Sequence, residues 1–270
     1  MMYTEVASLP FRKIYAIDFE YCGADGEIPN IVCMVTQDLR SGGVSRCWRD
    51  DLSEMRTPPF EAGEDVAIVS YFAPAEVQSM LALDWDIDVS VIDLFAEFRC
   101  QTNGNPDVGR KSLVSALQLY GLEQFIPEEK DSMRDLILSG GPWSEAQRSA
   151  ILDYCQQDVV ALGPLLNAML RHAPWSELQF NQALLRGRYM KAVGAMQHRG
   201  IPIDLGLLDK LNTNWEDIKL NLIENVDAQY GVYVDGRFKE ALFQSYLARE
   251  GIPWPRLDSG RLALDRNTFS

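Results

Sequence analysis

The sequence predicts an α/β fold with a mixed central sheet flanked by helices, followed by a helical C-terminal region. Short apolar runs rich in β-branched and aromatic residues alternate with helix-like stretches up to about residue 172. The first three runs follow one another closely, which favours an antiparallel meander at the start of the sheet. From residue 173 onward the pattern is helical.

The composition is that of a folded protein with a substantial core. The chain has 270 residues, 47% of them hydrophobic, which is enough for one or two domains. No stretch has the apolar length of a membrane span, and the N-terminus lacks a signal-peptide pattern. The five cysteines form no CxxC pair, so we expect neither a disulfide framework nor a zinc site. These features predict a cytoplasmic protein.

The net charge of −14 argues against a generic nucleic-acid binder, which would carry a basic surface. An enzyme that holds a strand end through metal ions is still compatible with it. Part of the negative charge would then belong to catalytic acids that bound cations neutralise. Any affinity for nucleic acid should be modest and depend on the metal.

The first predicted strand ends in two carboxylates. Residues 14–17 form an apolar run typical of a buried strand, and Asp18 and Glu20 follow it on one face, because side chains alternate along a strand. Two carboxylates on one face repel each other, and burying them is costly unless a cation such as Mg²⁺ or Mn²⁺ neutralises them. Asp-x-Glu is nevertheless a common tripeptide, and alone it favours an ordinary half-exposed strand.

The next elements continue the sheet. Residues 28–36 and 44–48 predict the second and third strands, and residues 66–69 predict another buried strand. The proline- and acid-rich stretch 51–65 between them is expected to be a solvated connection. After the strand at 66–69, the run 70–81 predicts a helix with a proline in its first turn.

The following residues alternate again and then become helical. Residues 89–92 predict a short strand, and Asp93 is well placed to cap the helix after it. Amphipathic helices are expected at residues 111–120, 128–138 and 144–170. Gly163-Pro164 should kink or break the last of these.

The helix at 144–170 carries a second unusual acid. Tyr154 and Asp158 are four residues apart, so both project from the same side of the helix, next to its apolar stripe. An acid in that position normally lies in solvent unless something in the interior requires it.

The two patterns are specific as a pair. Asp18-x-Glu20 at a strand end, with Tyr154-x-x-x-Asp158 on a helix more than a hundred residues later, resembles the first and third motifs of the DnaQ-like, or DEDD, 3′→5′ exonucleases of the tyrosine branch. The resemblance implies a ribonuclease H-like fold for residues 1–172.

The second motif of this family is a strand leading to Asn-x-x-(Phe/Tyr)-Asp. By position Glu76 matches the aspartate and Phe72 the asparagine, and both are departures. Glutamate is one methylene longer, so its helix must sit slightly further back. Asp84 and Asp86 are competing acids in a loop-like run. Asp93 matches the aspartate that follows the motif in family A polymerases.

The C-terminal third resembles a different part of the same enzymes. Residues 184–204 are similar to the segment that opens the polymerase part of family A DNA polymerases, with Gln197 where an acid is usual. The resemblance therefore divides the chain into an exonuclease domain at 1–172 and a helical region at 173–270. The motifs of nucleotide addition have no room in this sequence, so no polymerase active site is expected.

The resemblance implies two-metal phosphodiester hydrolysis, with two Mg²⁺ or Mn²⁺ ions about 3.5–4 Å apart. Asp18 would bridge both ions, and Glu20 and Asp158 would complete the site of the attacking water. Glu76 would support the second ion. Tyr154 would hold the water by a hydrogen bond rather than ionise, since its reference pKa is about 10.

Several residues are candidates for binding the substrate. Tyr21 and Phe72 could stack on terminal bases, worth roughly 1–3 kcal/mol per base, although core packing would also explain Phe72. Arg99 and Asn103 lie near a turn and could reach a phosphate or pair with nearby acids.

A group of basic residues also stands out in the C-terminal helices. At helical spacing Arg188, Lys191 and Arg199 can share one broad face, whereas Arg186 lies further round. This face could track a DNA backbone, or its residues could pair with acids of the exonuclease domain.

The sequence thus predicts a metal-dependent 3′→5′ exonuclease of proofreading type that releases nucleoside 5′-monophosphates from DNA 3′ ends, preferably single-stranded. A bacterial, phage or plasmid origin is expected, together with a polymerase partner or a polymerase domain outside this sequence. Two alternatives stay open. One is an exoribonuclease of the same superfamily, since only the polymerase-like third favours DNA. The other is a catalytically silent domain that binds nucleic acid or a polymerase.

Overall fold

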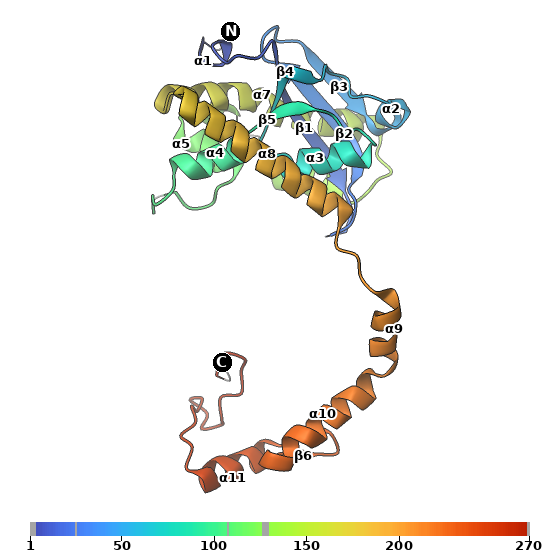
Figure 1. Cartoon of the computed structure of the whole chain (residues 1–270), viewed down its shortest axis with the longest axis vertical. Coiled ribbons are helices and arrows are strands. Elements are labelled where there is room, and N and C mark those ends of the chain that lie inside the picture. The colour runs from blue at the N-terminus through green and yellow to red at the C-terminus, as the bar shows by residue number, and fades with distance from the viewer. Residues whose placement is uncertain (1–3, 25, 107, 126–129, 269–270) are drawn as a thin grey trace. The chain divides into compact units, whose positions relative to one another are not determined.

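The computed structural model describes residues 4–24, 26–106, 108–125 and 130–268 (Figure 1). Residues Met1–Gly200 form one compact unit and Ile201–Ser270 a second. Among the described residues, none of the helices combines the length and the apolar character needed to cross a membrane.

A five-stranded mixed sheet forms the centre of the first unit. Its strands are β1 (Lys13–Cys22), β2 (Asn30–Asp38), β3 (Val44–Trp48), β4 (Gly63–Ser70) and β5 (Val89–Asp93). They lie in the order β3-β2-β1-β4-β5. The meander β1–β2–β3 is antiparallel, as predicted, whereas β4 and β5 run parallel to β1. The predicted α/β class, with a mixed central sheet flanked by helices, is confirmed.

Helices cover both faces of this sheet. They are α1 (Thr4–Ala7), α2 (Arg49–Glu54), α3 (Ala73–Ala82), α4 (Leu94–Gln101), α5 (Leu113–Leu119), α6 (Lys130–Leu138), α7 (Glu145–His172) and α8 (Glu177–Arg199), with a 3₁₀ turn at Glu123–Phe125. Two of these helices, α2 and α7, bear on what the sequence predicted. The expected solvated connection after β3 begins with α2, because Leu52 is buried against the sheet. The long helix α7 is not broken at Pro164, where the sequence predicted a kink or a break.

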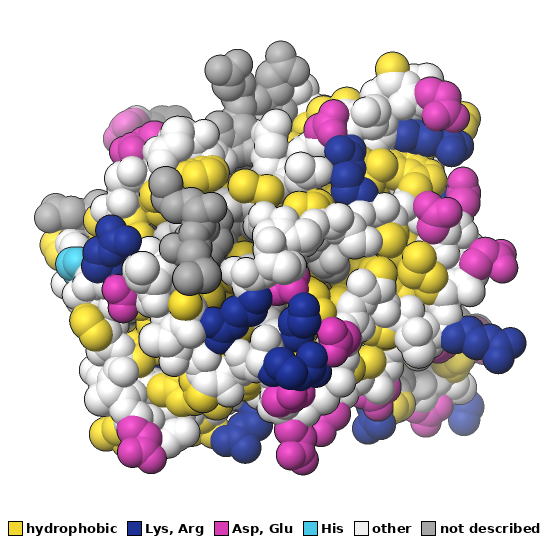
Figure 2. Space-filling model, turned by 90° about the horizontal axis from the view of Figure 1, so that it is seen from above, with side chains coloured by type: hydrophobic (Ala, Val, Ile, Leu, Met, Phe, Trp, Pro, Cys, Tyr) yellow, Lys and Arg dark blue, Asp and Glu magenta, His cyan; other side chains and the backbone are white. Residues whose placement is uncertain are grey.

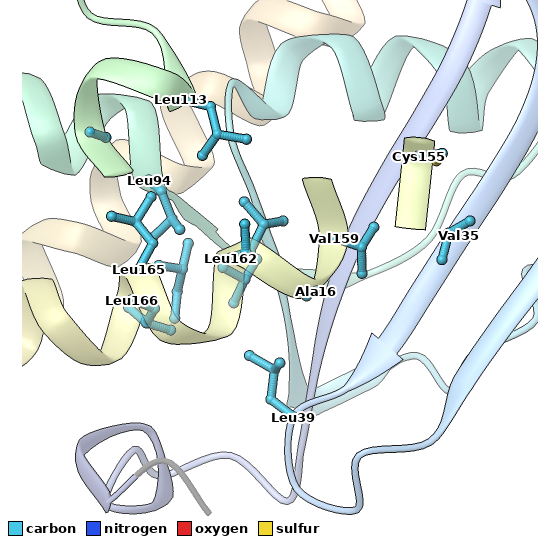
Figure 3. Packing of buried hydrophobic residues seen from close by; sticks show 14 of the residues in the cluster. Ala16, Val35, Leu39, Leu94, Leu113, Cys155, Val159, Leu162, Leu165 and Leu166 are labelled. Atoms are coloured by element: carbon cyan, nitrogen blue, oxygen red, sulfur yellow. The ribbon is translucent and has the colours of Figure 1, made fainter. Parts of the chain in front are cut away.

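The strict alternation of β1 separates two apolar cores. Ile14 and Ala16 face α7, whose Cys155 and Val159 pack beside β1 and β2 (Figure 3). Tyr15 and Ile17 face the opposite core, which α3 and Met190 of α8 complete. Asp18 and Glu20 have the parity of Ala16, so β1 directs both carboxylates to the α7 face.

The boundary between the units lies later than the sequence suggested. We expected it near residue 172, but α8 packs against α3 and β5 and belongs to the first unit. Two glycines allow this close approach. A Cβ on Gly187 would lie 1.8 Å from the carbonyl oxygen of Val91, and one on Gly194 would lie 2.8 Å from that of Pro74. The compact unit therefore ends at Gly200.

The second unit has a small core of its own. It contains α9 (Leu205–Thr213), α10 (Trp215–Tyr230), the hairpin β6 (Tyr233–Val234)–β7 (Arg237–Phe238) and α11 (Glu240–Glu250). The hairpin interrupts a region that was expected to be helical. Val232, Phe243, Leu247 and Leu262 form the buried cluster. No described residue of α9 or α10 is buried, so most of this unit's apolar side chains remain at its surface.

Candidate active site

A pocket of about 300 Å³ lies where β1, the start of α3, α6 and α7 meet. Its walls bring together residues from four separate stretches of the sequence. The lining residues are Asp18, Phe19, Glu20, Tyr21, Tyr71, Phe72, Ala75, Glu76, Arg134, Ile137, Leu138, Tyr154 and Asp158. All five residues proposed for catalysis are among them, together with Tyr21 and Phe72.

The end of β1 supplies two carboxylates. Its parallel pairing with β4 covers Lys13 to Ala16, so the strand continues past the last paired residue to Asp18 and Glu20. The register with β2 shifts between Glu20 and Tyr21, a β-bulge of the kind that re-aims side chains beside functional sites. Both carboxylates are half-buried at the pocket wall.

Glu76 is the third carboxylate and the most deeply buried. Its side chain stands in the first turn of α3 and is 3% exposed. The Phe19 N–H donates to this carboxyl, whereas Oε2 has no hydrogen-bond partner among the described residues. Burial, reinforced by the charges of Asp18 and Glu20, raises the pKa of Glu76 well above its usual range. Glutamate is one methylene longer than the aspartate expected at this position, and its carboxyl nevertheless lies at the pocket.

A buried aspartate holds the helix that carries Glu76. Asp93 accepts a hydrogen bond from the Ala96 N–H at 2.9 Å, which is the predicted N-cap of α4, and a second from the Ala73 N–H at 2.8 Å. Burial raises the pKa of Asp93, while these backbone donors oppose the rise. One side chain therefore fixes the N-termini of both α3 and α4.

Phe72 occupies an unusual backbone conformation immediately before α3. Its φ of 81° lies in the left-handed region that bulky residues rarely adopt. The ring is 39% exposed at the pocket and packs edge-to-face on Phe95, with 5.2 Å between the ring centroids. The side chain is thus held at the pocket wall rather than in the core.

Helix α7 supplies the remaining two predicted residues. It begins in a capping box formed by Ser144 and Gln147, and Tyr154 and Asp158 further along the helix line the pocket. Burial, followed by the charges of Asp158 and Glu20, raises the pKa of Tyr154 above its usual range. The phenol therefore stays protonated at neutral pH and can donate a hydrogen bond.

The structure adds residues that the sequence analysis missed. The Cys155 thiol donates toward Asp18, with Sγ 3.4 Å from both Oδ2 and the carbonyl oxygen. Arg134 of α6 and Tyr71 also line the pocket. Cys155 could have been noticed as the neighbour of Tyr154 on the apolar side of its helix. The sequence around Arg134 holds no comparable signal.

Other predicted substrate-binding residues lie away from this pocket. The Arg99 guanidinium stacks on the Phe95 ring at 5.5 Å, and Asn103 is exposed on the loop after α4. Arg188 is exposed on α8, and Lys191 Nζ donates to the carbonyl oxygen of Ile87 at 2.7 Å. None of these four lines the pocket.

Arg186 and Asp86 also lie outside this pocket. Arg186 forms a two-bond ion pair with the buried Glu97, at 2.6 and 2.8 Å, so its role is the structural one that the sequence left open. Asp86, the acid that competes with Glu76, lines a different pocket beside α8, with Lys191. On the face seen in Figure 2, basic and acidic side chains are interspersed rather than gathered into one basic area.

The donor set fits a hard divalent cation. Asp18, Glu20 and Asp158 offer carboxylate oxygens around one pocket, and the buried Oε2 of Glu76 has no partner among the described residues. Several carboxylates that share one partly buried pocket raise the free energy of the folded protein unless a cation neutralises them. These four residues are therefore the candidate metal ligands.

Comparisons with known proteins relate this fold to nucleic-acid enzymes. No protein-family model matches the sequence, and no curated protein matches it significantly. A nuclease in its apo form is similar in structure, with 15% identity and a TM-score of 0.53 over 70% of this chain and 86% of the other.

Two further solved structures match nearly the whole chain. The POL domain of Pol1 from M. smegmatis, in complex with DNA primer–template and dNTP, is 12% identical with a TM-score of 0.53, and the match covers 98% of this chain but 42% of that one. RNase D from Escherichia coli, an exoribonuclease, is 14% identical with a TM-score of 0.44 over 99% of this chain and 68% of that one. At this level of identity, the matches to the nuclease and Pol1 show a shared fold.

Proposed function

We propose that this protein is a metal-dependent 3′→5′ exonuclease that releases nucleoside 5′-monophosphates from single-stranded DNA ends. The convergence of Asp18, Glu20, Glu76 and Asp158 with Tyr154 in one pocket supports this proposal most directly. A fold shared with a nuclease is consistent with it. Proofreading for a polymerase partner is the cellular task that we infer.

The four carboxylates, Asp18, Glu20, Glu76 and Asp158, would hold the metal ions, Mg²⁺ or Mn²⁺. When bound, such ions activate water and stabilise the leaving oxygen of a phosphodiester. Tyr154, which burial keeps protonated, orients the attacking water by a hydrogen bond. Arg134 brings a positive charge to a pocket that is otherwise acidic, and it is placed to contact the substrate phosphates.

The two exposed aromatic side chains of the pocket are suited to a single-stranded end. Tyr21 is 38% exposed and Phe72 is 39% exposed, so each presents ring surface to the pocket. Stacking on an unpaired base is worth roughly 1–3 kcal/mol and requires no particular sequence. The terminal base of a paired end would first have to leave its base pair and its neighbouring base. We therefore propose single-stranded DNA as the preferred substrate.

DNA rather than RNA is proposed because the structural match to Pol1, a protein in complex with DNA, extends over 98% of this chain. In that proposal the second unit corresponds to the start of the polymerase region. Arg188 and Lys191, outside the pocket, remain proposed contacts for the DNA backbone. Their joint replacement by alanine should raise KM and flatten the salt dependence, by about 0.7 in slope per lost single-strand contact.

A comparison of DNA and RNA substrates of the same sequence tests the proposed preference for DNA. We would incubate the protein with 5′-labelled single-stranded DNA and RNA of the same sequence, with Mg²⁺, Mn²⁺ or excess EDTA. The proposal expects a ladder of progressively shortened DNA only when metal is present. Faster shortening of RNA would make the protein an exoribonuclease. No shortening of either strand, with retained metal-dependent DNA binding, would identify a catalytically silent binding domain.

A further inference from the structure

One thiol lies directly against the carboxylate proposed to bridge the metals. Cys155 is fully buried between α7 and the sheet, and Figure 3 shows it beside Val35 of β2. Its Sγ is 3.4 Å from Asp18 Oδ2. This sulfur and one oxygen each from Asp18 and Glu20 all lie within 4.8 Å of one another.

A second, independent observation concerns the pocket that Asp18 and Glu20 line. The Glu76 carboxyl, 3% exposed, lines the same pocket, and its Oε2 is buried without a hydrogen-bond partner among the described residues. The negative charges of Asp18 and Glu20 act on this carboxyl and disfavour its ionisation. An acid placed in this way requires a proton or a cation, so the cluster of Asp18, Glu20 and Cys155 borders a position where positive charge is needed.

We propose that Cys155, Asp18 and Glu20 form a mixed thiolate–carboxylate site that binds a thiophilic divalent cation such as Zn²⁺. On binding, the thiol proton is released to solvent and a metal–sulfur bond replaces the S–H bond, so the net charge added is +1. Sulfur and carboxylate are both ordinary zinc ligands, and three protein ligands leave a fourth position open. No local pattern in the sequence indicates this site, because the three residues come from two distant stretches.

The choice of cation follows from the ligand types. Mg²⁺ requires oxygen donors, whereas a thiolate favours Zn²⁺ and its spectroscopic substitute Co²⁺. A thiophilic ion here would occupy Asp18 and Glu20 and so compete with the hard ions of the proposed hydrolysis. This inference rests on the proposed function only for that competition, and the site itself can be tested without any nuclease assay.

Co²⁺ titration of the full chain provides a direct test. A bond from thiolate sulfur to Co²⁺ gives an intense near-ultraviolet charge-transfer band, which carboxylates do not produce. We expect the band in the wild type and in Cys100→Ser, which removes an exposed cysteine as a control. Cys155→Ser and Cys155→Ala should lose it, with Co²⁺ affinity reduced at least about tenfold, the lower range for weaker perturbations of metal sites.

X-ray absorption at the zinc edge provides a second measurement that needs no variant. One sulfur among the ligands of Zn²⁺ in the wild type would support the proposal. A shell of oxygen and nitrogen alone, or a Co²⁺ band that persists in Cys155→Ser, would overturn it. A missing sulfur ligand with intact Mg²⁺-dependent hydrolysis would refute only this inference. A sulfur-bound metal in the zinc-loaded protein, together with no hydrolysis by a zinc-free sample supplied with Mg²⁺ or Mn²⁺, would instead refute the proposed function.

Discussion

Replacing Asp93 by alanine should loosen the helix that carries Glu76. Asp93 is 1% exposed and accepts hydrogen bonds from two backbone N–H groups, those of Ala96 and Ala73. Losing the N-cap of α4 costs about 0.5–2 kcal/mol. Leaving the buried Ala73 N–H without a partner costs about 1–3 kcal/mol more. We therefore expect the free energy of unfolding to fall by about 1.5–5 kcal/mol in total, with part of the loss local to α3.

Hydrogen exchange with mass spectrometry would locate that loss. In Asp93→Ala the amides at the start of α3 should exchange faster than in the wild type, and Mn²⁺ should bind more weakly because Glu76 is displaced. Asp93→Asn keeps one acceptor oxygen, so its exchange rates in α3 and its affinity for Mn²⁺ should lie between those of the wild type and of Asp93→Ala. Ser112→Ala removes the exposed cap of α5, where the Ser115 N–H is 3.2 Å away, and serves as the matched control.

The outcome that refutes this reasoning is specific. If Asp93→Ala costs no more than Ser112→Ala, about 0.5–2 kcal/mol, and leaves exchange in α3 unchanged, the bond to Ala73 contributes nothing to the position of Glu76. Glu76 would then be held in position by the packing of α3 and α8 alone.

Four further substitutions test separate parts of the account. Tyr154→Phe should lower kcat roughly 10²-fold with metal binding retained, and an unchanged rate would leave the phenol a packing role only. Because folding raises the pKa of Glu76, the metal-free protein should lose stability as pH rises above the ordinary glutamate range. In Glu76→Gln, denaturant unfolding at several pH values should show a smaller loss of stability with rising pH than in the wild type. The same pH dependence in both proteins would contradict this. Arg134→Ala should raise KM and reduce its salt dependence, and equal values at all salt concentrations would exclude a phosphate contact. Gly187→Ala places a methyl 1.8 Å from the carbonyl oxygen of Val91 and should lower the stability of the first unit by about 1–3 kcal/mol or more, and a neutral effect would mean that α8 does not pack there.

The parts of the fold that the sequence could predict are those that local patterns determine. The period-2 alternation of β1 assigns Asp18 and Glu20 to one face, and the four-residue spacing of Tyr154 and Asp158 assigns them to one side of α7. The structure brings these pairs together, with Glu76, around one pocket. The mixed sheet and its flanking helices were predicted for the same reason.

What the sequence could not show depends on contacts between distant segments. Cys155 has the pattern of an ordinary core residue, and only the docking of α7 on β1 places it beside Asp18. Arg134 reaches the pocket because α6 lies against β1. The boundary at Gly200 depends on how closely Gly187 lets α8 approach β5, a property of the packed backbone rather than of helical periodicity.

The most direct test of the central claim is the identity of the product released from a single-stranded DNA labelled in its 3′-terminal nucleotide. With Mg²⁺, the account predicts that the label first appears as a nucleoside 5′-monophosphate. It also predicts no release in excess EDTA or by Asp18→Ala, provided that this variant melts at the wild-type temperature. Release that continues in EDTA or in Asp18→Ala, or a label that leaves first in longer fragments, would contradict a metal-dependent 3′→5′ exonuclease at this pocket.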